Sequence, residues 1–106
     1  MTIKKKKSAA RSFLEELRGG PLTFGQMIKS LRLADEIAQV DLAHRLGISR
    51  AFLCDIEQGR RPVTVDRAAL FAKGMGYSET QFIAVALDDQ LREAGVHARV
   101  ELLKVA

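Results

Sequence analysis

The stretch QVDLAHRLGISRAFLCDIEQGRRP, which runs from Gln39 to Pro62, contains two short runs of apolar residues at helical spacing, one on each side of Gly47. Glycine readily adopts the left-handed backbone conformation that a tight corner requires. Ala43 is small at the place where the first helix must approach the second. The spacing therefore predicts two short helices that meet at one corner, which is a helix-turn-helix. The apolar residues that carry the pattern are Leu42, Ala43, Leu46, Ile48, Leu53 and Ile56.

The second of these helices is predicted to begin after Ser49, whose hydroxyl can accept a hydrogen bond from a free amide of the first turn. Its apolar residues point back to the core that it shares with the first helix. The side chains left on its outer face are those of Ser49, Arg50, Ala51 and Asp55. These four side chains are therefore the ones that can meet a partner.

As a whole, this stretch resembles the lambda repressor and Cro family of DNA-binding domains, also called the XRE type. The resemblance extends over about residues 23 to 91, and it implies a compact five-helix fold. The family usually has a glycine at the end of its first helix and Ser or Thr before the glutamine, whereas this chain has Glu36 and Ala38 there. The backbone conformation at Glu36 and the cap of the next helix are therefore left open. The residues that carry the resemblance are Gln39, Leu42, Ala43, Gly47, Ile48, Ser49, Ile56, Glu57, Gly59, Arg61 and Pro62.

The resemblance also implies roles for the side chains of Arg32, Glu57 and Gln39. Arg32 corresponds to an arginine that pairs with the glutamate closing the second helix of the motif, which is Glu57 in this chain. The alternative for Arg32 is a solvated surface arginine. Gln39 opens the motif at a helix N-terminus, where its side-chain amide is implied to hold a DNA phosphate and to brace the recognition helix.

Residues 49 to 57 would form the recognition helix in the major groove. Arg50 is predicted to be the main base reader, because its planar guanidinium can contact both acceptors of guanine. Ala51 offers a methyl-sized contact to thymine, and Ser49 can contact a base or a phosphate. Asp55 either accepts a hydrogen bond from a cytosine amino group or orients Arg50. Phe52 is expected to be half-buried, with a thymine contact as the alternative.

The loop after this helix and the distribution of charge both favour a nucleic-acid partner. Arg60 and Arg61 follow a glycine and are predicted to contact backbone phosphates, which fix register without reading sequence. A solvated loop is the alternative. Residues 1–61 hold 12 Lys or Arg against 7 Asp or Glu, a net charge of +5, while residues 62–106 hold 5 against 6, a net charge of −1. The basic half is the one that contains the motif.

The chain is predicted to divide into three parts. Residues 1–22 read as a basic tail, either solvated or an arm for phosphate contacts, followed by a short accessory helix over residues 9–18. Residues 23–94 form the DNA-binding domain. Residues 95–106 alternate apolar and polar side chains, which predicts a strand that pairs with a second subunit or a foreign sheet edge, with a frayed tail as the alternative. The predicted fold is all-α, a five-helix repressor-like helix-turn-helix domain with an extra N-terminal helix and a short C-terminal strand.

These features predict a transcriptional regulator, most simply a repressor that binds a palindromic operator in double-stranded DNA as a homodimer. In the resembling family, the surface of the fifth helix often forms the dimer interface. The alternative is an antitoxin that neutralises a small toxin protein and represses its own operon, because the predicted terminal elements have no obvious use in a lone monomer. RNA binding is disfavoured, since one Tyr and five Phe offer no visible stacking platform.

No pattern typical of catalysis, metal binding or cofactor binding is present in the sequence, so we predict that the protein is not an enzyme and needs no cofactor. Cys54 is the only cysteine, which excludes an intrachain disulfide and a four-cysteine metal site. A Gly-rich phosphate loop and an H-E-x-x-H motif are both lacking. No apolar run approaches the roughly 18 residues of a membrane span. Without a signal-peptide pattern, the sequence predicts a cytoplasmic protein.

Overall fold

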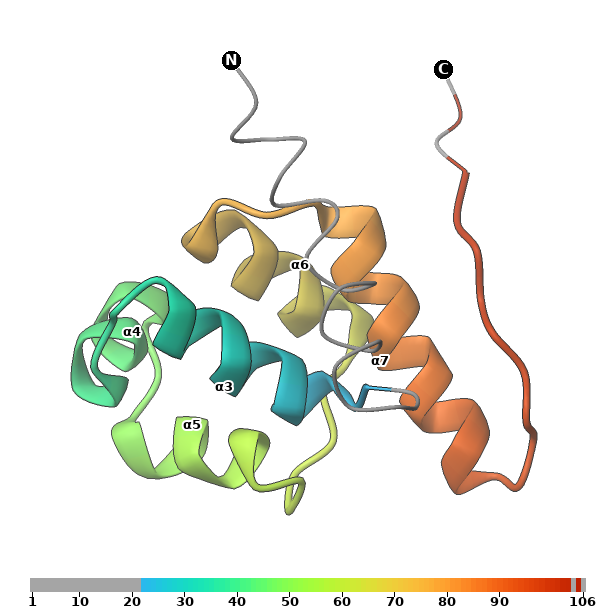
Figure 1. The fold of residues 1–106 in the computed structure, drawn as a ribbon, viewed down its shortest axis with the longest axis horizontal. Coiled ribbons are helices and arrows are strands. Elements are labelled where there is room, and N and C mark those ends of the chain that lie inside the picture. The colour runs from blue at the N-terminus through green and yellow to red at the C-terminus, as the bar shows by residue number, and fades with distance from the viewer. Residues whose placement is uncertain (1–21, 104, 106) are drawn as a thin grey trace.

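The structure is a computed structural model of the 106-residue chain, and it describes residues 22–103 and 105. Figure 1 shows α3 crossing the middle of the molecule, with α5 on one side of it and α6 and α7 on the other. This arrangement confirms the predicted all-α domain with five helices in the described residues. The helices are α3 (Phe24–Ala34), α4 (Gln39–Leu46), α5 (Arg50–Glu57), α6 (Val65–Met75) and α7 (Glu79–Glu93).

Four of the five helices have a Ser or Thr hydroxyl as their N-cap. Thr23, Ser49, Thr64 and Ser78 each accept a hydrogen bond from the backbone N–H three residues further on. Such caps satisfy an amide that has no partner within the helix. At α4 the cap position is occupied by Ala38, which cannot supply this bond.

The core is built around the ring of Phe24, which joins three helices. Its centroid lies 5.7 Å from that of Phe71 on α6 and 5.8 Å from that of Phe82 on α7, both in edge-to-face geometry. Aromatic pairs favour this geometry because the positive edge of one ring meets the negative face of the other. The remaining buried apolar side chains surround this cluster, and they include Met27, Ile28, Leu42, Leu53, Ile56, Ala68 and Val85.

A close approach between α3 and α5 places the recognition helix. A Cβ atom added at Gly25 would lie 2.2 Å from the carbonyl oxygen of Ile56 and 2.9 Å from that of Glu57. Only a residue without a side chain therefore allows the end of α5 to lie against the first turn of α3.

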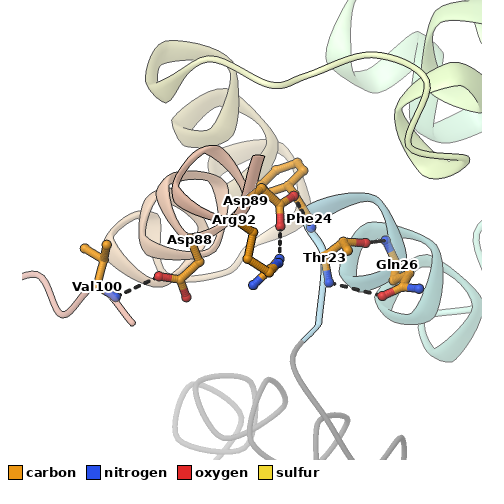
Figure 2. A network of polar contacts seen from close by, with 7 residues as sticks. All are labelled: Thr23, Phe24, Gln26, Asp88, Asp89, Arg92 and Val100. Atoms are coloured by element: carbon orange, nitrogen blue, oxygen red, sulfur yellow. Dashed lines mark hydrogen bonds and ion pairs between the residues drawn. The ribbon is translucent and has the colours of Figure 1, made fainter. Parts of the chain in front are cut away.

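Polar contacts tie the start of α3 to α7, as Figure 2 shows. The backbone N–H of Phe24 donates to Asp89 Oδ2 at 2.8 Å, and Arg92 also pairs with this carboxylate. Burial raises the pKa of Asp89, while the hydrogen bond from Phe24 and the charge of Arg92 act in the opposite direction. Thr23 and Gln26 complete the reciprocal capping box of α3, each with a bond of 3.1 Å.

The prediction of a C-terminal strand is wrong for the described residues of this segment. Residues 96–103 and 105 have no regular secondary structure, and they run beside α7 in Figure 1. A strand requires a neighbouring strand for its backbone N–H and C=O groups, and the described residues contain none. The backbone N–H of Val100 instead donates to Asp88 Oδ1 on α7 at 2.7 Å. Val96 and Leu102, which lie on the apolar side of the predicted strand, are exposed, so that side is not covered by a partner.

The predicted basic tail and accessory helix at residues 9–18 lie outside the described residues. Within the part of the chain that the structure describes, no helix is both long enough and apolar enough to cross a bilayer.

Candidate nucleic-acid interface

The corner between α4 and α5 is made by Gly47. This residue has φ 70° and ψ 29°, and the adjoining N–H of Ile48 donates to the carbonyl of Ala43 at 3.0 Å. A Cβ atom at Gly47 would meet no atom within 4 Å, so the demand for glycine comes from the backbone conformation and not from crowding. Ala43 is buried in the core next to this turn. The corner thereby fixes the direction in which α5 leaves α4.

A buried ionic network holds the other end of α5. Arg32 on α3 contacts both carboxylate oxygens of Glu57, with Nε 2.7 Å from Oε2 and Nη2 3.1 Å from Oε1. Both residues are less than a tenth exposed. Arg32 Nη1 donates to the carbonyl of Ile37 at 2.8 Å, and Gln39 Nε2 donates to Glu57 Oε1 at 2.9 Å. Helices α3, α4 and α5 are therefore joined through one carboxylate.

Gln39 remains half-buried at the first position of α4 while it braces Glu57. An amide group has two N–H donors and a carbonyl oxygen. The contact with Glu57 uses one donor, which leaves the second donor and the oxygen for another ligand.

The opposite face of α5 is exposed at its first turn. Arg50 and Ala51 are both exposed, and among the described residues the Arg50 side chain has no hydrogen bond or ion pair. Ser49 is also exposed, and its Oγ accepts from the backbone N–H of Phe52 at 3.0 Å. A guanidinium that is not used inside the molecule can donate all its N–H groups to an external acceptor.

Asp55 pairs with Arg60 and not with Arg50. Arg60 Nε donates to Asp55 Oδ1 at 3.0 Å, and Arg60 Nη2 lies 3.8 Å from Cys54 Sγ. The hydrogen bond to Asp55 raises the pKa of Arg60. Among the described residues, the contact through which Asp55 would orient Arg50 is not formed, and the predicted contact of Asp55 with cytosine stays a prediction. Gly59 has a left-handed backbone conformation, and the backbone N–H of Arg60 donates to the carbonyl of Asp55 at 2.8 Å, so the loop returns to the helix beside Asp55.

Phe52 lies under two guanidinium groups. The Cζ atoms of Arg61 and Arg67 are each 4.5 Å from the centroid of the Phe52 ring, and the ring itself is half-buried. This is within the range of cation–π contacts. Sequence reasoning did not identify Arg67, which lies in the first turn of α6. Its position three residues after the Thr64 cap was visible, but the contact depends on the path of the loop between the helices.

No group of three or more His, Cys, Asp or Glu side chains among the described residues could hold a metal ion. The arrangement around α5 thus consists of exposed donors on a small helix that is braced from behind.

Comparison with known proteins decides the family. The family model described as helix-turn-helix matches residues 28–82, about half of the chain. The chain belongs to the helix-turn-helix family of XRE-type DNA-binding transcription regulators. The match begins within α3 and ends within α7, so it covers the corner, the ionic network and the exposed face of α5.

Individual relatives of this helix-turn-helix regulator are similar over the same region. The control protein C.BamHI of Bacillus amyloliquefaciens is 34% identical over 56 residues, which are 52% of this chain and 69% of that protein. The crystal structure of the wild-type restriction-modification controller protein C.Esp1396I has 28% identity and a TM-score of 0.52, and the match covers 65% of this chain and 90% of that one. A transcriptional regulator from Vibrio cholerae has 29% identity and a TM-score of 0.53, over 64% of this chain and 37% of that chain.

Proposed function

We propose that this regulator is a repressor that binds a palindromic operator in double-stranded DNA as a homodimer. The observation that carries the proposal is the exposed Arg50 side chain, which has no partner among the described residues and stands in the first turn of α5. The rest of the helix is fixed by the Gly47 corner and by the buried contact of Glu57. A rigidly held helix with free donors at its N-terminal end suits contact with base edges in a groove.

The proposed contacts divide into base reading and backbone binding. Arg50 reads guanine, Ala51 contacts a thymine methyl group, and Ser49 donates to a base or a phosphate. Gln39 donates its second side-chain N–H to a phosphate. Arg60 and Arg61, in the loop after α5, bind phosphates of the DNA backbone. Asp55 acts by holding Arg60.

The homodimer is proposed to form through α7. Ile83, Leu87 and Leu91 follow one another at four-residue spacing, and all three are half-buried in the single chain. Residues at this spacing lie on one face of a helix. A dimer of this class places its recognition helices about 34 to 36 Å apart, which corresponds to half-sites about 10 base pairs apart. Residues 23–94 are proposed as the DNA-binding domain, and residues 1–22 and 95–106 as extensions.

The hypothesis of a toxin partner has no support in the described residues. It depended on an accessory helix at residues 9–18, which lies outside them, and on a C-terminal strand that is not formed.

Selection of bound duplexes from a random pool at a stated salt concentration tests the proposal. We expect a symmetric site with half-sites about 10 base pairs apart. Repeating the selection with Arg50→Ala should relax the preference at one position of each half-site, at a cost of about 1 to 3 kcal/mol. An asymmetric site would refute the homodimer, and an unchanged preference with Arg50→Ala would refute base reading by this residue. One similar protein, C.Esp1396I, is named a restriction-modification controller protein, so promoters of such systems are suitable first duplexes for a transcription assay of repression.

A further inference from the structure

Three side chains from separate elements meet beside the recognition helix. Phe52 belongs to α5, Arg61 to the loop that follows it, and Arg67 to the first turn of α6. Both guanidinium carbons lie 4.5 Å from the same ring centroid, so the two charges are at most about 9 Å apart, twice that distance.

These two charges are not neutralised within the described residues. Arg60, the neighbour of Arg61, pairs with Asp55 at 3.0 Å. No carboxylate of the described residues lies within ion-pair distance of Arg61 or Arg67. Asp66 is exposed in the same turn as Arg67 but does not pair with it. Two like charges held on one ring repel each other, and an anion that contacts both would remove this repulsion.

A guanidinium group that lies over an aromatic ring can still bind such an anion. A stacked contact uses the face of the planar group and keeps the N–H donors along its edge for the anion. A phosphate accepts two parallel N–H bonds from that edge. Because the ring already restricts both side chains, less conformational freedom is lost when the anion binds.

We propose that Arg61 and Arg67 form a phosphate clamp for the DNA backbone, with Phe52 as the positioning residue. The proposal rests on the proposed function as a DNA-binding regulator and adds to it a contact from α6 that the motif itself does not contain. The amides of the first turn of α6 also favour an anion near Arg67. Phe52 is covered by the two arginines and so is not available to contact thymine.

The clamp is tested by the salt dependence of binding, measured by fluorescence anisotropy on the selected operator and on a random duplex. Each phosphate contact contributes about 0.9 to the slope of log K against log salt concentration. We expect Arg67→Ala to reduce the slope on both duplexes, by at most about 0.9, because phosphate contacts are independent of sequence. Arg67→Gln, which keeps a polar side chain, should give the same loss and replaces the alanine variant should that variant melt early.

Lys73→Ala is the matched control. Lys73 is an exposed cation on the same helix, two turns away from Arg67, and its nearest carboxylate oxygen is 3.9 Å away on Glu79. This variant removes one positive charge from α6 without touching the clamp, so the slope should stay at the wild-type value. An equal slope for Arg67→Ala and Lys73→Ala, with unchanged thermal melting, would overturn the clamp.

The role of Phe52 has a separate readout. Phe52→Leu keeps both arginines but removes the aromatic face, and we expect it to lower the slope. Phe52→Tyr keeps an aromatic face and should have the wild-type slope. A loss in both variants would show that the residue serves packing only, which overturns its positioning role. A failure of the proposed function would look different. In that case the wild-type protein itself would bind neither duplex with a salt-dependent affinity.

Discussion

Glu36 is the one non-glycine residue with positive φ among those the structure describes, with φ 57°. It links α3 to α4, and the N–H of Ile37 just after it donates to the carbonyl of Arg32 at 3.0 Å. An L-residue in the left-handed region has its Cβ close to the following carbonyl oxygen, which costs roughly 1 to 2 kcal/mol. The turn is therefore held by the surrounding structure against the preference of the residue that occupies it.

Glu36→Gly should stabilise the protein. Glycine removes the clash of the Cβ atom, although it also increases the freedom of the unfolded chain, so we expect a net gain of about 0.5 to 1 kcal/mol in the free energy of unfolding. Urea denaturation followed by circular dichroism measures this gain. Glu36→Ala is the control, because alanine keeps the Cβ atom. A similar gain with both substitutions would point to the loss of the charge and not to the backbone.

Single residues explain why part of the fold was predictable. Thr23, Ser49 and Thr64 cap helices in the structure because a hydroxyl at such a position meets a free amide of its own helix, and this contact is local in sequence. The corner at Gly47 is likewise local, since it depends on the conformation of one residue.

Other residues of the site have partners that local patterns do not determine. The contact of Asp55 with Arg60 and the position of Arg67 over Phe52 both depend on the path of the chain after Gly59. The alternation from Val96 to Leu102 is typical of a strand, but a strand also needs a second strand, and a pattern in one segment does not supply it.

At the scale of elements, the position of α5 depends on how closely α3 approaches it. Gly25→Ala would place a Cβ atom 2.2 Å from the carbonyl oxygen of Ile56, a backbone atom that cannot move without moving the helix. We expect a loss of about 3 kcal/mol in the free energy of unfolding, at the upper end of overpacking effects. Chemical denaturation measures it.

Gly74→Ala is the matched control for this substitution. Gly74 lies inside α6, and a Cβ atom there would meet only the end of the Leu46 side chain, at 2.5 Å. Leu46 can rotate away, and alanine favours a helix by about 1 kcal/mol over glycine. The two effects should nearly cancel. A large loss for Gly74→Ala and none for Gly25→Ala would contradict the packing described for α3 and α5.

Tyr77 joins the end of α3 to the segment between α6 and α7. Its hydroxyl donates to Asp35 Oδ2 at 3.0 Å, and its ring stacks on Phe82. Burial, with the hydrogen bond and charge of Asp35 as further causes, raises the pKa of Tyr77 to about 12. Because the folded protein holds this proton more tightly than the unfolded chain, the contribution to stability is complete below pH 10 and is lost as the pH rises from about 10 to about 12.

A spectroscopic titration checks this pKa directly. Tyr77 is the only tyrosine of the chain, so the absorbance of tyrosinate reports on this group alone. The wild-type protein should titrate near 12, and Asp35→Asn should titrate at a lower pH, because it removes the negative charge. An identical titration of both proteins would show that Asp35 does not contribute.

At the scale of the whole molecule, the proposed DNA contacts and the proposed dimer contact belong to different helices. The former lie on α5, on the loop that follows it and on the first turn of α6, while α7 forms another edge of the molecule in Figure 1. The protomer measures 37 × 33 × 32 Å. In a two-fold dimer, equivalent points are separated by twice their distance from the axis, so recognition helices about 34 to 36 Å apart must each lie about 17 to 18 Å from it, which a protomer of this size allows.

The proposed dimer makes a prediction that concerns assembly and DNA binding together. Leu87→Glu places a charge in the middle of the apolar row formed by Ile83, Leu87 and Leu91 on α7. Burial of this charge against a second copy would require its desolvation. We expect sedimentation equilibrium to show a monomer, and the affinity for the two-half-site operator to fall to that for a single half-site. Leu70→Glu is the control, because Leu70 is an equally large apolar side chain on α6 that is 57% exposed. Thermal melting of both variants establishes that they fold. A folded Leu87→Glu protein that remains dimeric would place the interface on another face, and the half-site spacing would then have to arise from a different arrangement of the two recognition helices.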